Sequence, residues 1–238
     1  MQPDTLFIGQ SSVYLPTCRS TNEAAHQVLL KNEATEGTLL YTDNQTAGRG
    51  QRGNTWEAVP GQNITLSFLL KPVFLSLNDQ FYLTMCCSLA LADLLQPYVR
   101  EQIRVKWPND IYAGNKKIAG ILIENSTTGK TLQNSIIGIG ININQTKFGY
   151  PTATSLKLLA GREINLASIR KELSEQLEKR YLQLRSGKKD QLKKEYLHNL
   201  LRYQEWHPYK VGNQEITGMI VGVNETGKLA LQAGDKLL

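Results

Sequence analysis

The feature that most constrains the fold is a run of short apolar segments between residues 64 and 143. Residues 64–70, 103–107, 110–113, 118–124 and 135–143 are each short enough for a strand and too short for an ordinary helix. A further strand is expected at 37–43. Strands that follow one another in this way favour an α+β fold with a mixed or antiparallel sheet over a doubly wound parallel sheet.

Four helices are expected around these strands. Ser20-Thr21-Asn22-Glu23 has the form of a capping box, which predicts a helix over 21–31. An apolar stretch predicts a helix over 77–95 that ends before Pro97. Between 166 and 184 large apolar residues recur at intervals of three and four, which predicts a long amphipathic helix packed on the sheet. The last helix is expected over 191–201.

The pattern changes again at about residue 205. Residues 205–238 read as short strands joined by turns, among them Asn224-Glu225-Thr226-Gly227, and predict a separate small β unit. We therefore divide the chain into residues 1–202 and 203–238. One more strand is expected after Leu238, so the sequence is expected to be truncated there.

Composition excludes several classes of protein. No apolar stretch is long enough to span a membrane and the first residues do not resemble a signal peptide, so we expect a cytoplasmic protein without a membrane partner. Three cysteines cannot build a disulfide framework, and their spacing fits no zinc site. A net charge of +6 invites nucleic acid, but much of the excess lies in 157–210, where a solvated helix face explains it more simply.

The loop at residues 44–62 is the first segment that suggests chemistry. It contains Gly48-Arg49-Gly50-Gln51-Arg52-Gly53 and has neither helical nor strand periodicity. Glycines let the backbone approach a ligand, and arginines form charge-assisted hydrogen bonds with phosphate or carboxylate. Taken alone, the loop is either an anion-binding site or a mobile basic surface loop.

The second segment is Lys106-Trp107-Pro108-Asn109-Asp110, followed by Lys116, Lys117 and the apolar residues 118–123. Residues apolar on both faces predict a central strand, which would hold Lys117 as a positioned cation at its start. For Lys116 a solvated position beside the Gly114-Asn115 turn is favoured.

The third segment is Gly138-Ile139-Gly140-Ile141-Asn142-Ile143-Asn144. Glycines within a strand leave room on one face for a ligand, although such a stretch is also typical of a β-bulge.

These three segments, in this order, resemble the catalytic domain of biotin protein ligases. The shared motifs are a Gly-Arg-Gly-x-Arg-Gly-x-x-Trp loop, a Lys-Trp-Pro-Asn-Asp turn with a Lys-x-x-Gly-Ile-Leu strand, and a Gly-x-Gly-Ile-Asn-x-Asn strand. The resemblance covers roughly residues 15–235. It implies a class II synthetase-like biotin/lipoate ligase catalytic domain followed by a small SH3-like β barrel.

The resemblance also implies an activity. ATP would adenylate biotin to biotinyl-5′-AMP, and the biotinyl group would then pass to a lysine of a biotin carboxyl carrier protein. Mg²⁺ would accompany ATP, without a metal site built from protein ligands. The protein would be a monomer or a homodimer.

Site residues carry over position by position. The implied biotin contacts are Ser20, Thr21, Asn22, Gln45, Gly48, Arg49, Gly50, Gln51, Lys117, Gly120, Gly138 and Gly140. The implied ATP contacts are Arg49, Arg52, Trp56, Lys106, Asn109, Lys117 and Asn142, with residues 144–155 nearby. The implied catalytic groups are Lys117, Arg49, Arg52 and Asp110, the last to orient or deprotonate the acceptor amine.

Two departures from the family pattern qualify these expectations. Gln51 and Asn54 stand where other members often have basic residues, so the loop has less charge with which to retain the intermediate. The motifs begin near the first residue, which leaves no room for the helix-turn-helix of long members. We therefore expect no repressor function and no specific nucleic-acid partner.

Two other functions remain open. A lipoate protein ligase shares the fold and the adenylation chemistry, but the polar set Ser20, Thr21, Asn22 and Gln45 favours the ureido ring of biotin. A nucleic-acid-binding module would instead bind DNA or RNA in a salt-sensitive way and would release no pyrophosphate.

Overall fold

The computed structural model describes residues 2–238, with the side chain of Arg52 outside the described part. Its largest element is a seven-stranded sheet. The strands are β1 Ser12–Cys18, β2 Leu39–Gln45, β3 Ile64–Leu70, β4 Ile103–Lys106, β5 Asp110–Ala113, β6 Lys116–Thr128 and β7 Thr131–Ile141. They lie in the order β1-β2-β3-β7-β6-β5-β4, with β1 and β2 parallel and the other neighbours antiparallel. This mixed sheet confirms the predicted fold class.

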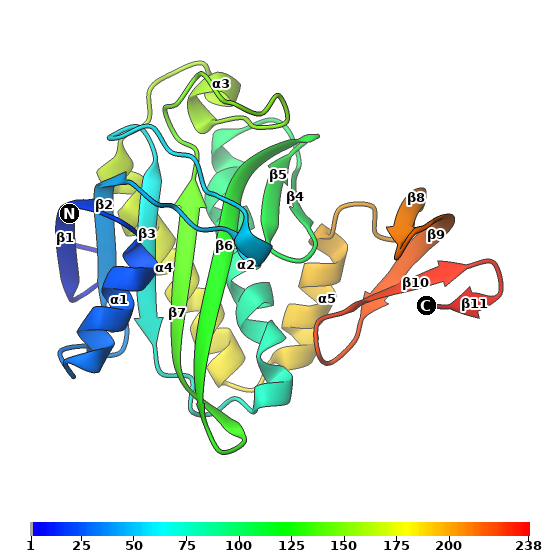
Figure 1. Ribbon diagram of the computed structural model, residues 1–238, viewed down its shortest axis with the longest axis horizontal. Coiled ribbons are helices and arrows are strands. Elements are labelled where there is room, and N and C mark those ends of the chain that lie inside the picture. The colour runs from blue at the N-terminus through cyan, green and yellow to red at the C-terminus, as the bar shows by residue number, and fades with distance from the viewer. Residues whose placement is uncertain (1) are drawn as a thin grey trace.

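Helices cover the two faces of this sheet unequally (Figure 1). On one face pack α2 Phe81–Leu95, α4 Leu166–Arg185 and α5 Lys189–Asn199. On the other face α1 Thr21–Leu30 contacts β2, β3 and β7. The short helix α3 Leu156–Ala160 lies at one end of the sheet, and 3₁₀ turns occupy Gln51–Gly53, Leu77–Asp79 and Gln96–Tyr98. The strands β5 and β6 and part of β7 are therefore free of helix on the α1 side.

Strand alternation gives these faces different side chains. From β3, Leu66 and Phe68 enter the main hydrophobic core with α2 and α4, whereas Leu69 packs in a small cluster under α1. Toward the middle of the sheet the α1 side carries small or polar residues instead, including Ser67. The face covered by α2, α4 and α5 is therefore apolar, and the open face is polar.

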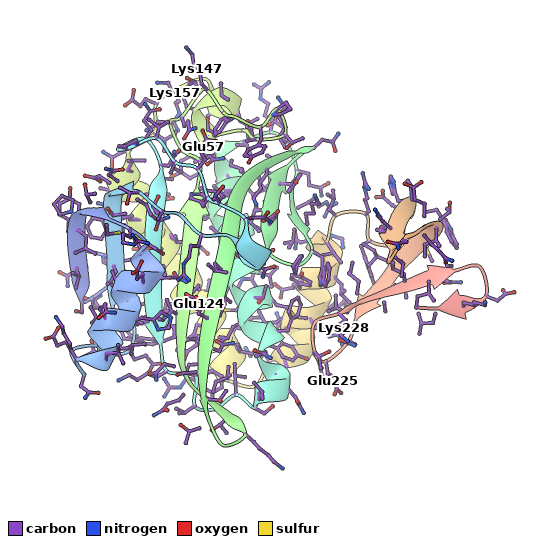
Figure 2. The ribbon with its side chains drawn as sticks, in the orientation of Figure 1. Glu57, Glu124, Lys147, Lys157, Glu225 and Lys228 are labelled. Atoms are coloured by element: carbon purple, nitrogen blue, oxygen red, sulfur yellow. The ribbon has the colours of Figure 1, made fainter. Side chains whose placement is uncertain are left out.

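The C-terminal residues form a second, antiparallel sheet. Its strands are β8 Trp206–Val211, β9 Gln214–Val223, β10 Leu229–Ala233 and β11 Lys236–Leu237, in the order β11-β10-β9-β8. Ile220, Val223 and Leu231 join the main core. Figure 2 marks the β9–β10 turn by Glu225 and Lys228. A Cβ at Gly227 in this turn would overlap the ring of Phe81 at the start of α2, and the Trp107 indole N–H donates to Gly227 O at 2.7 Å. A second β unit is confirmed, while its boundary at residues 202 and 203 stays a prediction.

Two local expectations need correction, and two elements were not predicted. Ser20 precedes α1 as predicted, so the expected start of this helix is confirmed. The capping box itself is wrong, because the Ser20 side chain makes no capping hydrogen bond among the described residues. The helix expected from residue 77 begins at Phe81, because Ser76 Oγ accepts from Asp79 N and closes a separate 3₁₀ turn. The strand β1 and the helix α3 were not predicted.

The structure also bears on the cysteines, on membrane-spanning helices and on metal sites. Burial raises the pKa of the Cys87 thiol to about 12 and also raises that of Cys86, so neither is a nucleophile at neutral pH. Within residues 2–238 no helix is both long and apolar enough to cross a membrane. In the same part of the chain no three His, Cys, Asp or Glu side chains are grouped as a metal site.

Candidate functional site

A cavity of about 280 Å³ lies on the open face of the sheet. Its wall combines the start of α1, the glycine–arginine loop, the turn before β5, and the glycines of β6 and β7. The structure thus brings together the three segments that the sequence singled out. Of the expected site residues, these line the cavity: Ser20, Thr21, Asn22, Gln45, Arg49, Gly50, Gln51, Trp56, Lys106, Asn109, Asp110, Lys117, Gly120, Gly138 and Gly140.

The glycine–arginine loop folds back on itself as a small hairpin. Arg49 pairs with Thr55 in an antiparallel bridge, Gly50 N donates to Asn54 O at 2.7 Å, and Trp56 N donates to Gly48 O at 3.0 Å. Gly48 lies outside the cavity wall, but a Cβ there would overlap the carbonyl of Trp56. Its lack of a side chain therefore allows the hairpin to close.

The hairpin places the Trp56 indole over glycines in the sheet. A Cβ at Gly140 would overlap the indole, and one at Gly120 would lie 3.2 Å from it. The indole Nε1 is buried and has no hydrogen-bond partner among the described residues. The glycines therefore make space for an aromatic ring that packs flat against the sheet and forms part of the cavity wall.

Lys117 owes its direction to an irregularity in β6. Ala119 pairs with Ile111 and Lys117 pairs with Tyr112, so Ile118 is an extra residue with no counterpart on β5. Such a bulge changes the face to which the preceding side chain points. Ile118 enters the core, and Lys117 lines the cavity with its Nζ 2.6 Å from Asp110 Oδ1. Lys116 is exposed, as predicted.

The backbone of Lys117 is also fixed from outside the sheet. Its N–H donates to Thr152 O at 2.7 Å, and its carbonyl accepts from Thr154 N at 2.9 Å. Asn142 holds the same segment, because its Nδ2 donates to Thr154 O at 3.0 Å. Asn142 itself is buried and lies outside the cavity wall, so its expected contact with nucleotide stays a prediction.

Arg49 is paired with a carboxylate that the sequence analysis did not select. Its Nη2 lies 3.2 Å from Glu124 Oε1, and Asn22 Nδ2 donates to Glu124 Oε2 at 2.7 Å. His26 Nε2 lies 3.7 Å from the same carboxylate. Figure 2 shows Glu124 on the face of the sheet that carries α1. The ion pair therefore joins the hairpin to β6 beside α1.

Neutral polar groups line the end of the cavity next to α1. Thr21 N donates to Gln45 Oε1 at 2.9 Å, and Ser67 Oγ lies 2.7 Å from both Thr21 Oγ1 and Asn22 Oδ1. At the other end, Asn109 Nδ2 donates to Ile121 O at 2.5 Å, next to the Lys117–Asp110 pair. One end thus suits a neutral polar ring and the other suits an anion. The side chain of Arg52, expected at the anion end, lies outside the described part.

Sequence reasoning missed nine residues of the wall. They are Asn54, Thr55, Thr65, Leu66, Trp107, Pro108, Ile121, Leu122 and Ile139. Thr65 and the neighbouring Ser67 had a recognisable signal, since polar residues at alternate positions of an apolar strand share one face. Asn54, Thr55, Trp107 and Pro108 line the cavity because the hairpin and the turn before β5 fold over the sheet, and the remaining four belong to the strands that form its floor.

Comparison with known proteins agrees with this geometry. Residues 14–142 match the model of the biotin/lipoate A/B protein ligase family. The chain is 36% identical over 182 residues to a bifunctional ligase/repressor BirA of Bacillus subtilis, which covers 74% of this chain and 55% of that protein. A biotin–[acetyl-CoA-carboxylase] ligase of Mycobacterium tuberculosis is 29% identical over 206 residues, covering 84% and 75%. The chain therefore spans about half the length of the Bacillus relative.

Solved structures show the same likeness along nearly the whole chain. The biotin protein ligase from Aquifex aeolicus in complex with biotin and ATP superposes with a TM-score of 0.80 at 26% identity, covering 96% of this chain and 94% of that one. The sequence match, the fold and the position of the cavity agree. The chain belongs to the biotin/lipoate A/B protein ligase family.

Proposed function

We propose that this protein is an ATP-dependent biotin protein ligase. One observation carries the proposal: a single cavity has different groups at its two ends. Thr21, Asn22 and Gln45 line a neutral polar end, and the cationic Lys117 lies at the other end. Biotin has the matching form, with a ureido ring at one end and a carboxylate at the other. The relatives named as biotin ligases, and the Aquifex structure with biotin and ATP, support this choice of substrate.

In the first half-reaction the biotin carboxylate would attack the α-phosphorus of ATP. A bond forms between a carboxylate oxygen and phosphorus, pyrophosphate leaves, and the product is the mixed anhydride biotinyl-5′-AMP. Two anions repel as they approach, so the protein must supply positive charge and alignment. Lys117, which the bulge in β6 turns toward the cavity, would supply this charge, and Arg49 would join it by leaving Glu124.

The nucleotide would lie near the hairpin and the turn before β5. Trp56, Lys106 and Asn109 belong to the cavity wall there. Among the described residues that line the cavity, Asp110 supplies the carboxylate. Mg²⁺ fits this donor set as an ion carried by ATP phosphates and water, with one protein carboxylate in reach, and would neutralise phosphate charge.

In the second half-reaction the amine of an acceptor lysine would attack the biotinyl carbonyl and expel AMP. The acceptor would be a biotin carboxyl carrier protein, in keeping with the carboxylase named for the Mycobacterium relative. Asp110 would orient this amine or take its proton. Because Asp110 is paired with Lys117 at 2.6 Å, this role requires that the pair loosen once Lys117 contacts the adenylate.

The remaining expectations complete the proposal. We place the enzyme in the cytoplasm, as a monomer or homodimer, without a sequence-specific nucleic-acid partner. The diffuse Lys and Arg residues would give at most weak, salt-sensitive DNA binding. A sequence-specific footprint at physiological salt would contradict this.

Lipoate is the competing substrate, because the family includes lipoate ligases. The experiment is pyrophosphate release from ATP with biotin or with lipoate, followed by mass measurement of a carrier domain incubated with the enzyme. We expect release and a biotinyl mass increase with biotin only. Release with lipoate alone would reassign the substrate, and release with neither would refute adenylation.

A further inference from the structure

Lys117 and Arg49, which the proposed reaction brings to the anion of the ligand, are each paired with a carboxylate of the protein. Lys117 Nζ lies 2.6 Å from Asp110 Oδ1, and Arg49 Nη2 lies 3.2 Å from both carboxylate oxygens of Glu124. Asp110 lines the cavity, whereas Glu124 lies outside its wall. An anion that enters the cavity must therefore compete for Arg49 with a carboxylate that stands beside the cavity.

Glu124 is held in place by groups other than Arg49. Asn22 Nδ2 donates to Glu124 Oε2 at 2.7 Å, and His26 Nε2 lies 3.7 Å from the same oxygen. Both groups belong to α1, and Asn22 is buried. The backbone of Glu124 lies within the β6–β7 ladder, where it pairs with Ile136. If the pair separates, we therefore expect Arg49 to move and Glu124 to stay.

Arg49 is well suited to such a movement. It lies in the glycine–arginine hairpin, and its side chain is 49% exposed. An ion pair with this much exposure contributes little to stability, because water screens the charges and the long side chain loses freedom. The exchange of Glu124 for an anion of the ligand therefore costs little, while Lys117 adds its own attraction for that anion from the cavity wall.

We propose that Glu124 is a positioning residue that keeps Arg49 at the side of the cavity until an anion of the ligand replaces it. The inference rests on the proposed function and adds a residue to it. Removal of the Glu124 charge should free Arg49 and tighten the binding of a carboxylate. A carboxylate that served the fold alone would act in the opposite direction, because its loss would loosen the hairpin and weaken the binding of every ligand.

The test uses Glu124→Gln, which removes the charge and keeps an oxygen that can accept from Asn22. Calorimetry would measure the Kd for biotin and for biotinamide, in which a neutral amide replaces the carboxylate. Glu163→Gln is the matched control, since Glu163 lies 3.5 Å from Lys157 Nζ in another exposed ion pair. Figure 2 shows Lys157 beside α3, away from Glu124. The control therefore separates loss of this ion pair from a change in net charge.

We expect Glu124→Gln to lower the Kd for biotin about twofold to fivefold, the range for a partly exposed ion pair. The Kd for biotinamide should change much less, because a neutral amide does not compete with Glu124 for the guanidinium. In an Arg49→Gln background, Glu124→Gln should have no further effect on the Kd for biotin. Glu163→Gln should bind both ligands as the unsubstituted chain does.

Three results would overturn the inference. These are an unchanged or higher Kd for biotin in Glu124→Gln, an equal gain for biotinamide, or the same gain in the absence of Arg49. If the unsubstituted chain binds lipoate and no biotin, the proposed substrate is wrong. Lipoate also carries a carboxylate, so lipoate and its amide would then replace the two biotin ligands in the same comparison and decide the role of Glu124.

Discussion

The two faces of strands β3, β7 and β6 show how one sheet can serve stability and binding separately. On the face covered by α2 and α4, side chains such as Phe68 and Ile137 are fully buried among apolar residues. On the face that α1 leaves open, the same strands present Ser67, Gly138 and Gly140 to the cavity or to the groups behind it. Substitution of a residue on the covered face should therefore lower the free energy of unfolding, whereas substitution of its neighbour on the open face should change binding or rate.

The largest expected effect lies on the covered face. Phe68→Ala should lower the free energy of unfolding by about 3–5 kcal/mol, because it removes a ring from a packed core and leaves a cavity. Urea unfolding monitored by circular dichroism measures this change. The folded variant should bind biotin with the Kd of the unsubstituted chain. A weaker affinity for biotin in the folded fraction would contradict the view that the covered face serves stability alone.

The next effect lies on the open face and concerns rate. Lys117→Ala should slow single-turnover pyrophosphate release by roughly a hundredfold or more, as expected for the loss of one group that stabilises transition-state charge. Lys116→Ala is the matched control, since Lys116 is the adjacent lysine and is exposed. Comparable losses from the two substitutions would refute the placement of Lys117 by the bulge.

A third substitution tests how the hairpin retains the intermediate. Gln51 lines the cavity at a position that is often basic in the family, and Gln51→Arg would add a charge-assisted bond worth about 1.5–3 kcal/mol. Dissociation of biotinyl-AMP should slow by about one to two orders of magnitude. Gln214→Arg adds the same charge at an exposed position on β9 and should leave the rate unchanged. An unaltered off-rate in Gln51→Arg would mean that charge at this position does not control retention.

The smallest expected effect comes from adding one methyl group to the open face. In Gly140→Ala the new Cβ would overlap the Trp56 indole, which must move with the hairpin. We expect a rise of about tenfold in the KM for ATP, equal to about 1.4 kcal/mol, with little change in unfolding free energy. Gly222→Ala is the control, because a Cβ there meets no described atom within 4 Å. A large loss of stability in Gly140→Ala would show that this glycine belongs to the core.

The sequence predicted those parts of the molecule that depend on local pattern. Strand β3 and the long helix α4 followed from apolar spacing. Most of the motif residues line one cavity, while Gly48 and Asn142 lie outside its wall. Strand β1 was not predicted, because it lies at the edge of the sheet, contains Pro16, and has no buried residue that would mark an apolar face. Local pattern also suggested a capping role for Ser20, whereas the structure places this residue in the cavity wall.

The rest depends on contacts between distant segments. Glu124 joins the site through Arg49 and Asn22, which are 75 and 102 residues away in sequence. The bulge that turns Lys117 toward the cavity arises from the register between β5 and β6, which the residues of β6 alone do not specify. Ser67 matters only because α1 places Thr21 and Asn22 over it. These contacts between distant residues can be identified only in the folded structure.

The most direct test of the account is a crystal structure of this chain grown with biotin and ATP. Electron density for biotinyl-AMP is expected in the cavity on the open face, with the ureido ring next to Thr21 and the acyl phosphate next to Lys117. The Glu124 carboxylate should still accept from Asn22. Density for either ligand at a different place on the protein, or an empty cavity at saturating concentrations of both, would contradict the account.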